Sequence, residues 1–264
     1  MKKWIVHRRL ALTVAACVCC CLPGVATATQ TARLDVHLTP ERLGAGTTII
    51  FGFQITGGGG QVPSPLTELN LSYPAHLGIG ASGLGFNTCR PAKLEAQGPE
   101  GCPADSRMGY GSALVEVPFG PQVIHETARI WTFSAPVKDG RLALLFYAVG
   151  ASPIDAELVF PAVIENAPAP FGGSLDTILP LVPSVPEAPD AAVVRLRSTI
   201  GPLNLTYYER VRGRLVAYKP RGIVLPRTCP RGGFPFAASF SFQDGSHTTA
   251  SDTVPCPSRK ISRS

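Results

Sequence analysis

The chain has 264 residues, of which 45% are hydrophobic and 16% are charged, and it contains 27 Gly and 26 Pro. Soluble domains average about 25% charged residues, so this composition excludes coiled coils, helical bundles and charged disordered tails. The formal net charge is +6. It falls to +2 when residues 1–28 are set aside, so the total charge does not indicate a nucleic-acid partner.

Residues 1–28 have the pattern of a secretory signal peptide. Four basic residues precede an apolar stretch at 10–25, and Ala26-Thr27-Ala28 supplies the small residues of a cleavage site. That stretch is shorter than the roughly 20 apolar residues of a membrane-spanning helix. We therefore expect cleavage near Ala28 and export from the cytoplasm. As an alternative, Val14-Ala15-Ala16-Cys17 would suit lipoprotein processing and leave a lipid anchor on Cys17.

Eight cysteines are divided equally between this leader and the rest of the chain, where Cys89, Cys102, Cys229 and Cys256 remain. An even number of cysteines in an exported chain implies disulfides. Three pairings are open. We favour Cys89–Cys102 and Cys229–Cys256, because each pair closes a local loop rich in Gly and Pro. A zinc site would need cysteines about two to four residues apart, so we predict no metal.

Apolar and polar residues alternate along most of the chain, which predicts β-strands. In chain order the expected strands cover 34–38, 49–55, 69–73, 112–117, 123–133, 141–149, 156–164, 192–199, 203–211, 215–218, 236–242 and 246–253. One short helix is expected at 91–96, where a proline begins it and a Gly-Pro pair ends it. Asp244-Gly245 predicts a hairpin with a type I′ turn, and Asp139-Gly140 and Arg212-Gly213 predict two more hairpins.

Many short strands with one short helix predict an all-β fold. The expected architecture is an antiparallel β-sandwich in the style of immunoglobulin domains, built as one unit or as two packed β lobes. A proline-rich connector at 179–190 would join an acidic β-sandwich region at 29–178 to a basic β region at 191–257 packed on it. The polar tail at 258–264 is expected to be disordered.

Charge changes sign at the connector. Residues 29–190 carry 8 basic and 15 acidic side chains, whereas residues 191–264 carry 12 basic and 3 acidic ones. The basic run consists of Arg195, Arg197, Arg210, Arg212, Arg214, Lys219, Arg221, Arg227 and Arg231.

Alternate residues of a strand share a face, so Arg195 would lie beside Arg197, and Arg210 beside Arg212. Together with Arg214 they form a candidate anion-binding surface for an anionic glycan or lipid. The competing interpretation, which we favour from the sequence alone, is that the acidic and basic regions neutralise each other.

The sequence contains only weak matches to motifs of catalytic or cofactor-binding sites. Gly78-Ile79-Gly80-Ala81-Ser82-Gly83 matches G-x-G-x-x-G, but no helix pattern follows it, so no dinucleotide cofactor is predicted. Asp155 and Glu157 would share a strand face, which is a spacing compatible with a secreted polymer hydrolase. The Asp, Ser and His of 244–247 are explained better by a hairpin tip than by a catalytic triad. We predict no catalytic residue, with the hydrolase as the alternative.

Short Pro, Gly and Cys motifs carry a resemblance to known proteins. Pro74-Ala75-His76-Leu77-Gly78 and Cys89 precede Cys102-Pro103-Ala104-Asp105-Ser106-Arg107-Met108-Gly109, and Cys229-Pro230-Arg231-Gly232-Gly233-Phe234-Pro235-Phe236 leads to Pro255-Cys256-Pro257. This order resembles exported β-rich proteins of high-GC actinobacteria. The group has no known activity, so the resemblance implies export, disulfides and β structure, and it transfers no functional residue.

The sequence therefore predicts an exported protein of the bacterial cell envelope or medium with a non-catalytic structural, adhesive or binding role. Expected partners are an envelope polyanion or another surface protein, and not nucleic acid. We expect no cofactor and no transmembrane segment after signal cleavage. The oligomeric state is left open.

Overall fold

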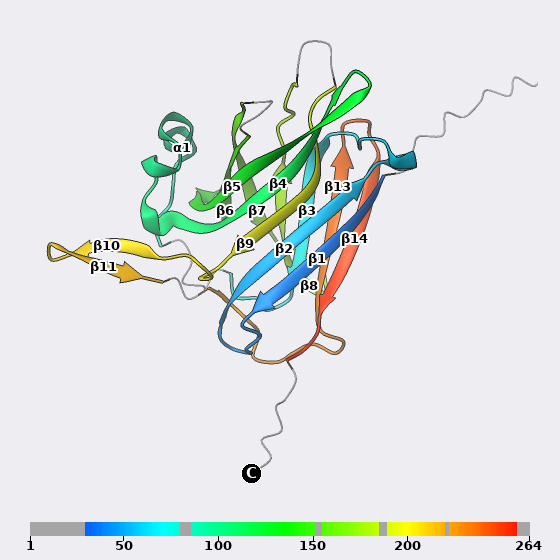
Figure 1. Ribbon diagram of the computed structural model, residues 1–264. Helices are drawn as coiled ribbons and strands as arrows, with labels where there is room; N and C mark the ends of the chain where they lie inside the picture. The colour runs from blue at the N-terminus through cyan, green and yellow to red at the C-terminus, as the bar shows by residue number, and fades with distance from the viewer. Residues whose placement is uncertain (1–29, 80–85, 151–154, 185–188, 220–221, 258–264) are drawn as a thin grey trace, which may run out of the picture.

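The computed structural model describes residues 30–79, 86–150, 155–184, 189–219 and 222–257 (Figure 1). Several expected features lie outside these ranges: the signal peptide and its cleavage site with Cys17, residues 80–83 of the G-x-G-x-x-G match, connector residues 185–188 and the tail at 258–264.

Strands make up most of the described chain, which confirms the all-β prediction. In order they are β1 Thr31–Thr39, β2 Gly46–Thr56, β3 Leu66–Pro74, β4 Arg107–Phe119, β5 Gln122–Lys138, β6 Arg141–Val149, β7 Glu157–Glu165, β8 Phe171–Ile178, β9 Ala192–Ile200, β10 Tyr207–Val211, β11 Arg214–Tyr218, β12 Ile223–Val224, β13 Phe234–Phe242 and β14 His247–Val254. The described ranges contain one α-helix, α1 Pro91–Gln97, and three short 3-10 turns, η1 Gly58–Gly60, η2 Pro99–Gly101 and η3 Ala104–Ser106.

One continuous antiparallel sheet forms the body of the protein. Its strand order is β1-β2-β9-β4-β5-β6-β7-β8-β3-β13-β14, with β12 added to β2, while β10 and β11 pair only with each other. The sheet curls over on itself into a nearly closed, barrel-like sandwich, so that β1 lies beside β14 (Figure 1). Strands from both sides of the connector share this sheet, because β9 lies between β2 and β4. Of the strands in residues 191–257, β9, β12, β13 and β14 therefore belong to the same sheet as the strands of residues 30–178.

Side chains join the two edge strands where the sheet almost closes. The backbone N–H of Val36 in β1 donates to Asp252 Oδ2 in β14 over 2.7 Å. The Gln30 side-chain amide donates to Ser246 Oγ over 2.8 Å and to Asp244 Oδ2 over 3.3 Å. An edge strand exposes unpaired backbone groups that invite association with other chains, and these bonds cover part of that edge.

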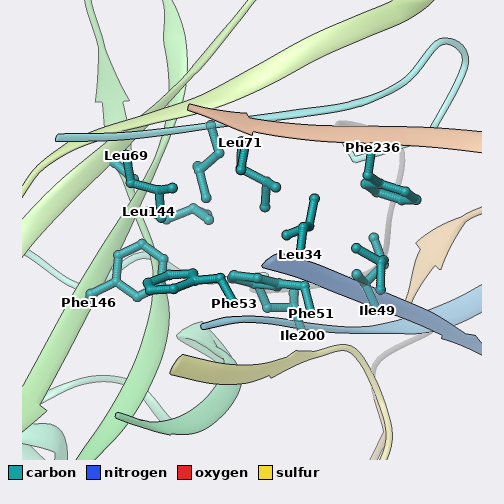
Figure 2. Packing of buried hydrophobic residues seen from close by; sticks show 14 of the residues in the cluster. Leu34, Ile49, Phe51, Phe53, Leu69, Leu71, Leu144, Phe146, Ile200 and Phe236 are labelled. Atoms are coloured by element: carbon teal, nitrogen blue, oxygen red, sulfur yellow. The ribbon is translucent and has the colours of Figure 1, made fainter. Parts of the chain in front are cut away.

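The inward faces of the strands form the main hydrophobic core. Residues such as Leu34, Phe51 and Leu71 point into it from three different strands (Figure 2). Phe53 and Phe240 meet edge to face with their ring centroids 5.1 Å apart, an arrangement that aromatic quadrupoles favour. Alternation with period two places these residues inside and their polar neighbours outside.

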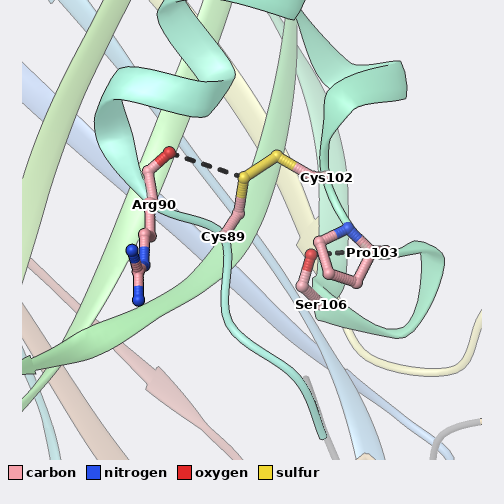
Figure 3. Close-up of a disulfide and its surroundings, with 5 residues drawn as sticks. All are labelled: Cys89, Arg90, Cys102, Pro103 and Ser106. Atoms are coloured by element: carbon pink, nitrogen blue, oxygen red, sulfur yellow. Dashed lines mark hydrogen bonds between the residues drawn. A yellow bond between two sulfur atoms is a disulfide. The ribbon is translucent and has the colours of Figure 1, made fainter.

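A second, smaller core lies on the outer face of β5, β6 and β7. The segment containing α1 covers this face, and Leu94 of α1 is fully buried against it. A disulfide between Cys89 and Cys102, with Cα atoms 5.2 Å apart, joins the two ends of this segment, which runs from residue 89 to residue 102 (Figure 3). The second disulfide joins Cys229 to Cys256. Both disulfides are the ones predicted from the sequence.

The hairpin turns differ from expectation in one respect. Asp244-Gly245 does connect β13 to β14, but only Gly245 has a positive φ, of 80°. The predicted type I′ turn is therefore wrong at this position, because that turn needs positive φ at both central residues. Both residues are positive at Asp139-Gly140 and at Arg212-Gly213. Asp244 instead accepts a 2.9 Å hydrogen bond from the Ser246 backbone N–H, which supports the turn.

Strand β8 was not expected from the sequence. Its start, Phe171-Gly172-Gly173, lacks the side chains that make an alternating pattern visible. A Cβ atom at Gly172 would lie 2.6 Å from the Ala75 Cα, and one at Gly173 would overlap the Tyr73 ring. Glycine is needed here because the chain passes too close to β3 for any side chain.

Candidate anion-binding surface

The structure divides the arginines of the predicted anion site into two groups. Arg195 and Arg197 lie on the exposed outer face of β9, inside the main sheet. Arg210, Arg212 and Arg214 lie on the β10–β11 hairpin, which projects away from the sandwich (Figure 1). The shared strand face expected for Arg210 and Arg212 is not formed, because Arg212 occupies the turn at the end of β10.

Strand pairing adds two arginines that no sequence pattern indicated. Arg33 of β1 faces Gln54 of β2, and Gln54 in turn faces Arg195. In the next row Arg197 faces Ser112 of β4, and Ser112 faces Arg129 of β5. Residues directly opposite each other in an antiparallel pair point to the same side of the sheet. The four side chains Arg33, Arg129, Arg195 and Arg197 therefore share one surface, which we name the arginine face.

The spacing of this surface follows from sheet geometry. Neighbouring strands lie about 4.8 Å apart, so the Cα atoms of Arg197 and Arg129 are separated by about 10 Å. The two rows are about 7 Å apart along the strands, and the surface extends about 19 Å from β1 to β5. These dimensions exceed those of a single phosphate or sulfate group, and they match several anionic groups repeated along a chain.

None of the four guanidinium groups makes an ion pair with a described residue. Asp35 faces Gly52 in the Arg197 row, but its Oδ2 atom lies 3.2 Å from Nε2 of His37. Similarly, Oε1 of Glu116 lies 3.3 Å from Nε2 of His125. Within the described ranges the arginine ion pairs are those of Arg141 with Asp139 and with Glu165. The expected neutralisation of the basic region by the acidic region is therefore absent from the described ion pairs.

Small and aromatic residues flank these arginines. Gly52 and Ser112 stand on either side of Arg197, so no large side chain crowds its guanidinium group. The Arg129 guanidinium lies 5.5 Å from the centre of the Trp131 ring, a cation–π contact. Trp131 faces Tyr110 across β4 and β5, which places two partly exposed rings beside the Arg197 row.

The other sequence candidates have structural explanations. Asp155 and Glu157 are exposed at the start of β7, and Glu157 lies near the buried Tyr147. Burial of Tyr147 raises the pKa of its hydroxyl, and the hydrogen bond and charge of Glu157 add to this effect. Hydrogen bonds from Ser246 lower the pKa of Asp244, the residue that supports the β13–β14 turn.

In the described ranges His, Cys, Asp and Glu side chains form no group of three that could hold a metal ion. The described part of the chain holds no helix with the length and apolar character that crossing a membrane requires.

An apolar cavity of about 100 Å³ lies at one end of the sandwich. Small inward residues, including Ala113, Ala128 and Ala148, leave this space, and connector residues Leu179 and Leu181 line it. An apolar cavity that holds benzene has a volume of about 150 Å³. This cavity is smaller and almost wholly apolar, so it offers nothing that would hold an anion.

No family model, curated protein or solved structure matches the chain. The arginine face is therefore interpreted from its own residues and their geometry.

Proposed function

We propose that this chain is a non-catalytic binding protein that acts outside the cytoplasm and holds an anionic glycan of the cell envelope on its arginine face. The observation that carries the proposal is the gathering of Arg33, Arg129, Arg195 and Arg197 on one exposed sheet surface without an ion pair to any described residue. Unpaired arginines on a flat surface attract anions and form paired hydrogen bonds with sulfate, phosphate or carboxylate groups.

The location outside the cytoplasm is supported by the two disulfides. Cys89–Cys102 and Cys229–Cys256 together use every cysteine of the described ranges. Such bonds persist in oxidising compartments and are rare in the cytosol. The leader-like pattern of residues 1–28 agrees with this location.

A polysaccharide suits this surface better than a small anion does. The arginines are spread over about 19 Å, so one small anion could contact only part of the surface. Tyr110 and Trp131 lie beside the Arg197 row, and aromatic rings of this kind provide flat apolar surfaces against which a sugar ring can lie. The proposed ligand is therefore a glycan with repeated acidic groups.

The proposal is tested by measuring the affinity of the purified protein for fluorescent heparin across a range of salt concentrations. The face variant combines three substitutions, Arg129→Gln, Arg195→Gln and Arg197→Gln. The hairpin variant removes the same charge elsewhere, through Arg210→Gln, Arg212→Gln and Arg214→Gln. We expect binding to weaken as salt rises, and the face variant to lose at least about tenfold in affinity while the hairpin variant loses less than about threefold.

Two results would contradict the proposal. Equal losses in both variants would show that net charge, and not the arginine face, determines binding. Unchanged binding in the face variant would remove that surface from the interaction. Long-chain polyphosphate serves as a second probe: a stronger preference for polyphosphate than for heparin would assign the surface to phosphate polymers instead of glycans.

A further inference from the structure

The β10–β11 hairpin is the second unusual surface of the molecule, and its interpretation is independent of the arginine face. Leu205 and Tyr207 are buried at its base, with exposures of 7% and 2%. The next residue, Tyr208, is 59% exposed. From this point the hairpin leaves the sandwich and projects into solvent (Figure 1). With five residues in each strand, it extends about 17 Å.

Large apolar side chains on this hairpin are open to solvent. Leu215 is 63% exposed, Val216 is 45% exposed and Val211 is 44% exposed. A two-stranded hairpin without a third strand or a packed face is marginally stable in water. Clustered exposed apolar residues indicate an interaction surface, so the hairpin has the composition of a segment that is covered when the protein functions.

Positive charge coincides with these apolar residues. Arg210, Arg212, Arg214 and Lys219 are all exposed, and none forms an ion pair within the described ranges. The β4–β5 hairpin also exposes apolar side chains, at Phe119 and Val123, but it has no Lys or Arg between residues 108 and 128. The β5–β6 hairpin exposes Val137 and Leu142 beside Lys138 and Arg141, but there Arg141 is ion-paired with Asp139 and Glu165. The β10–β11 hairpin combines exposed apolar side chains with basic residues that make no described ion pair, so its partner must be both apolar and anionic.

The two faces of the hairpin indicate which partner this is. Arg210 pairs with Leu215, so one face carries a basic and an apolar residue side by side. On the opposite face Val211 pairs with Arg214 and Val216 with Glu209, so that face also carries apolar residues beside charged ones, one basic and one acidic. A protein groove would cover one face and leave the other exposed. A lipid interface surrounds an inserted segment on all sides, with apolar side chains toward the acyl chains and arginines reaching the headgroups.

We propose that the β10–β11 hairpin inserts its tip into the surface of a bilayer that contains anionic phospholipid. The arginines at the tip extend their guanidinium groups back to the lipid phosphates. Val211 and Leu215, which adjoin the turn, reach the boundary between headgroups and acyl chains. Val216 and Tyr208 lie farther from the tip, in the interface that aromatic residues favour. The hairpin would then fix the sandwich to a membrane surface while the arginine face stays in the aqueous phase.

The test measures binding to phosphatidylcholine vesicles prepared with or without phosphatidylglycerol. We expect binding only when phosphatidylglycerol is present. The hairpin variant should bind about 100-fold more weakly, since each basic residue near an anionic surface contributes roughly a factor of five. The face variant, which removes the same charge, serves as the control and should change binding less than about threefold.

Insertion is tested separately from charge attraction. Leu215→Ser combined with Val216→Ser should weaken vesicle binding about tenfold, and both positions are exposed enough that folding should be unaffected. Leu215→Trp introduces a reporter whose emission should shift to shorter wavelength on vesicles and be quenched by brominated lipid. The shift is measured against the unsubstituted protein, because Trp131 is present in both.

Three results would overturn the proposal: equal binding to both kinds of vesicle, equal losses in the hairpin and face variants, or no spectral shift at Leu215→Trp. A dimer in solution that dissociates on Leu215→Ser with Val216→Ser would assign the hairpin to a second copy of the chain instead. Heparin binding is measured without lipid, and vesicle binding is measured without heparin. Failure of the membrane proposal therefore leaves the proposed glycan interaction intact, and failure of the glycan proposal leaves the membrane proposal intact.

Discussion

The outer face of the main sheet has two parts, of which one is buried under another segment of the chain and the other is exposed to solvent. Over residues 131–135 of β5 and over β6 and β7, it is covered by the segment from Cys89 to Cys102 and becomes a second core around Leu94 and Leu145. Over β1, β2, β9, β4 and residues 122–129 of β5, it remains open to solvent and carries the four residues of the arginine face. The same pleated surface is core where the chain supplies a cover, and an exposed face that carries arginines where it does not.

The strand sequences reflect this difference. In β6 six consecutive residues from Ala143 to Ala148 are buried, because both faces of that strand are covered. In β9 buried Val194 and Ser198 flank the exposed Arg195 and Arg197. Continuous burial marks a strand between two packed layers, and alternation marks a strand with one wet face.

The largest effect is expected at the contact that makes the covered part a core. Leu94→Ala should lower the free energy of unfolding by about 4 kcal/mol, since Leu94 is 0% exposed and its loss leaves a cavity. On the open part of the face, Leu114→Ala should cost only about 1 kcal/mol, because that side chain is already partly exposed. Urea denaturation of both variants measures the difference. Similar losses in the free energy of unfolding for the two variants would show that the outer face is not divided into a buried part and an exposed part.

Opening the disulfide over the covered part is expected to have the next largest effect. Cys89→Ser with Cys102→Ser should cost about 3 kcal/mol in the chain-entropy model. The matched change, Cys229→Ser with Cys256→Ser, should cost about 0.6 kcal/mol more, because its cysteines are 27 residues apart instead of 13.

A local measurement distinguishes the two disulfides. Only the loss of Cys89–Cys102 should change the environment of Trp131, which packs against the smaller core. Tryptophan fluorescence of the folded variants reports this change. Unchanged fluorescence in the Cys89→Ser, Cys102→Ser variant would mean that the α1 segment holds its position without the disulfide.

The smallest effect is confined to alkaline pH. Burial under the cover raises the pKa of Tyr147 above its ordinary value of 10.0. A group with a raised folded-state pKa contributes stability that is present below the unfolded pKa and is lost as the pH rises through the folded pKa. The protein should therefore lose stability above about pH 10 more steeply than its Tyr147→Phe variant does.

The control for this measurement is Tyr208→Phe on the exposed hairpin, which should keep the steep loss of the unsubstituted protein. Urea denaturation at a series of alkaline pH values gives the slopes. Parallel curves for the protein and its Tyr147→Phe variant would show that Tyr147 is not held in a desolvated site.

Local sequence signals predicted the elements that depend on neighbouring residues. The helix at 91–97 follows from Pro91 at its start and from Gly98, whose φ of 62° ends it. The β13–β14 hairpin follows from Asp244-Gly245, although the turn type does not, because the Asp244 side chain accepts hydrogen bonds that hold a different turn. Strand β8 escaped detection because its glycines serve contacts with a distant strand.

The candidate site was predicted only in part, for a related reason. Arg195 and Arg197 were recognisable as neighbours because they lie two residues apart on one strand. Arg33 and Arg129 carried no signal, since their place beside β9 depends on which strands pair and in what register. The hairpin arginines were grouped with β9 by their closeness in sequence, and the fold separates them.

By itself, the sequence determined the β character of the chain, the short helix and the alternation that puts arginines of β9 outside, because these follow from periods of two residues and from local backbone chemistry. Only the tertiary structure decided which strands became neighbours, which part of the outer face was covered and which hairpin left the sheet. Those outcomes depend on contacts between residues far apart in the chain, and alternation reports the face of a strand without identifying its partner.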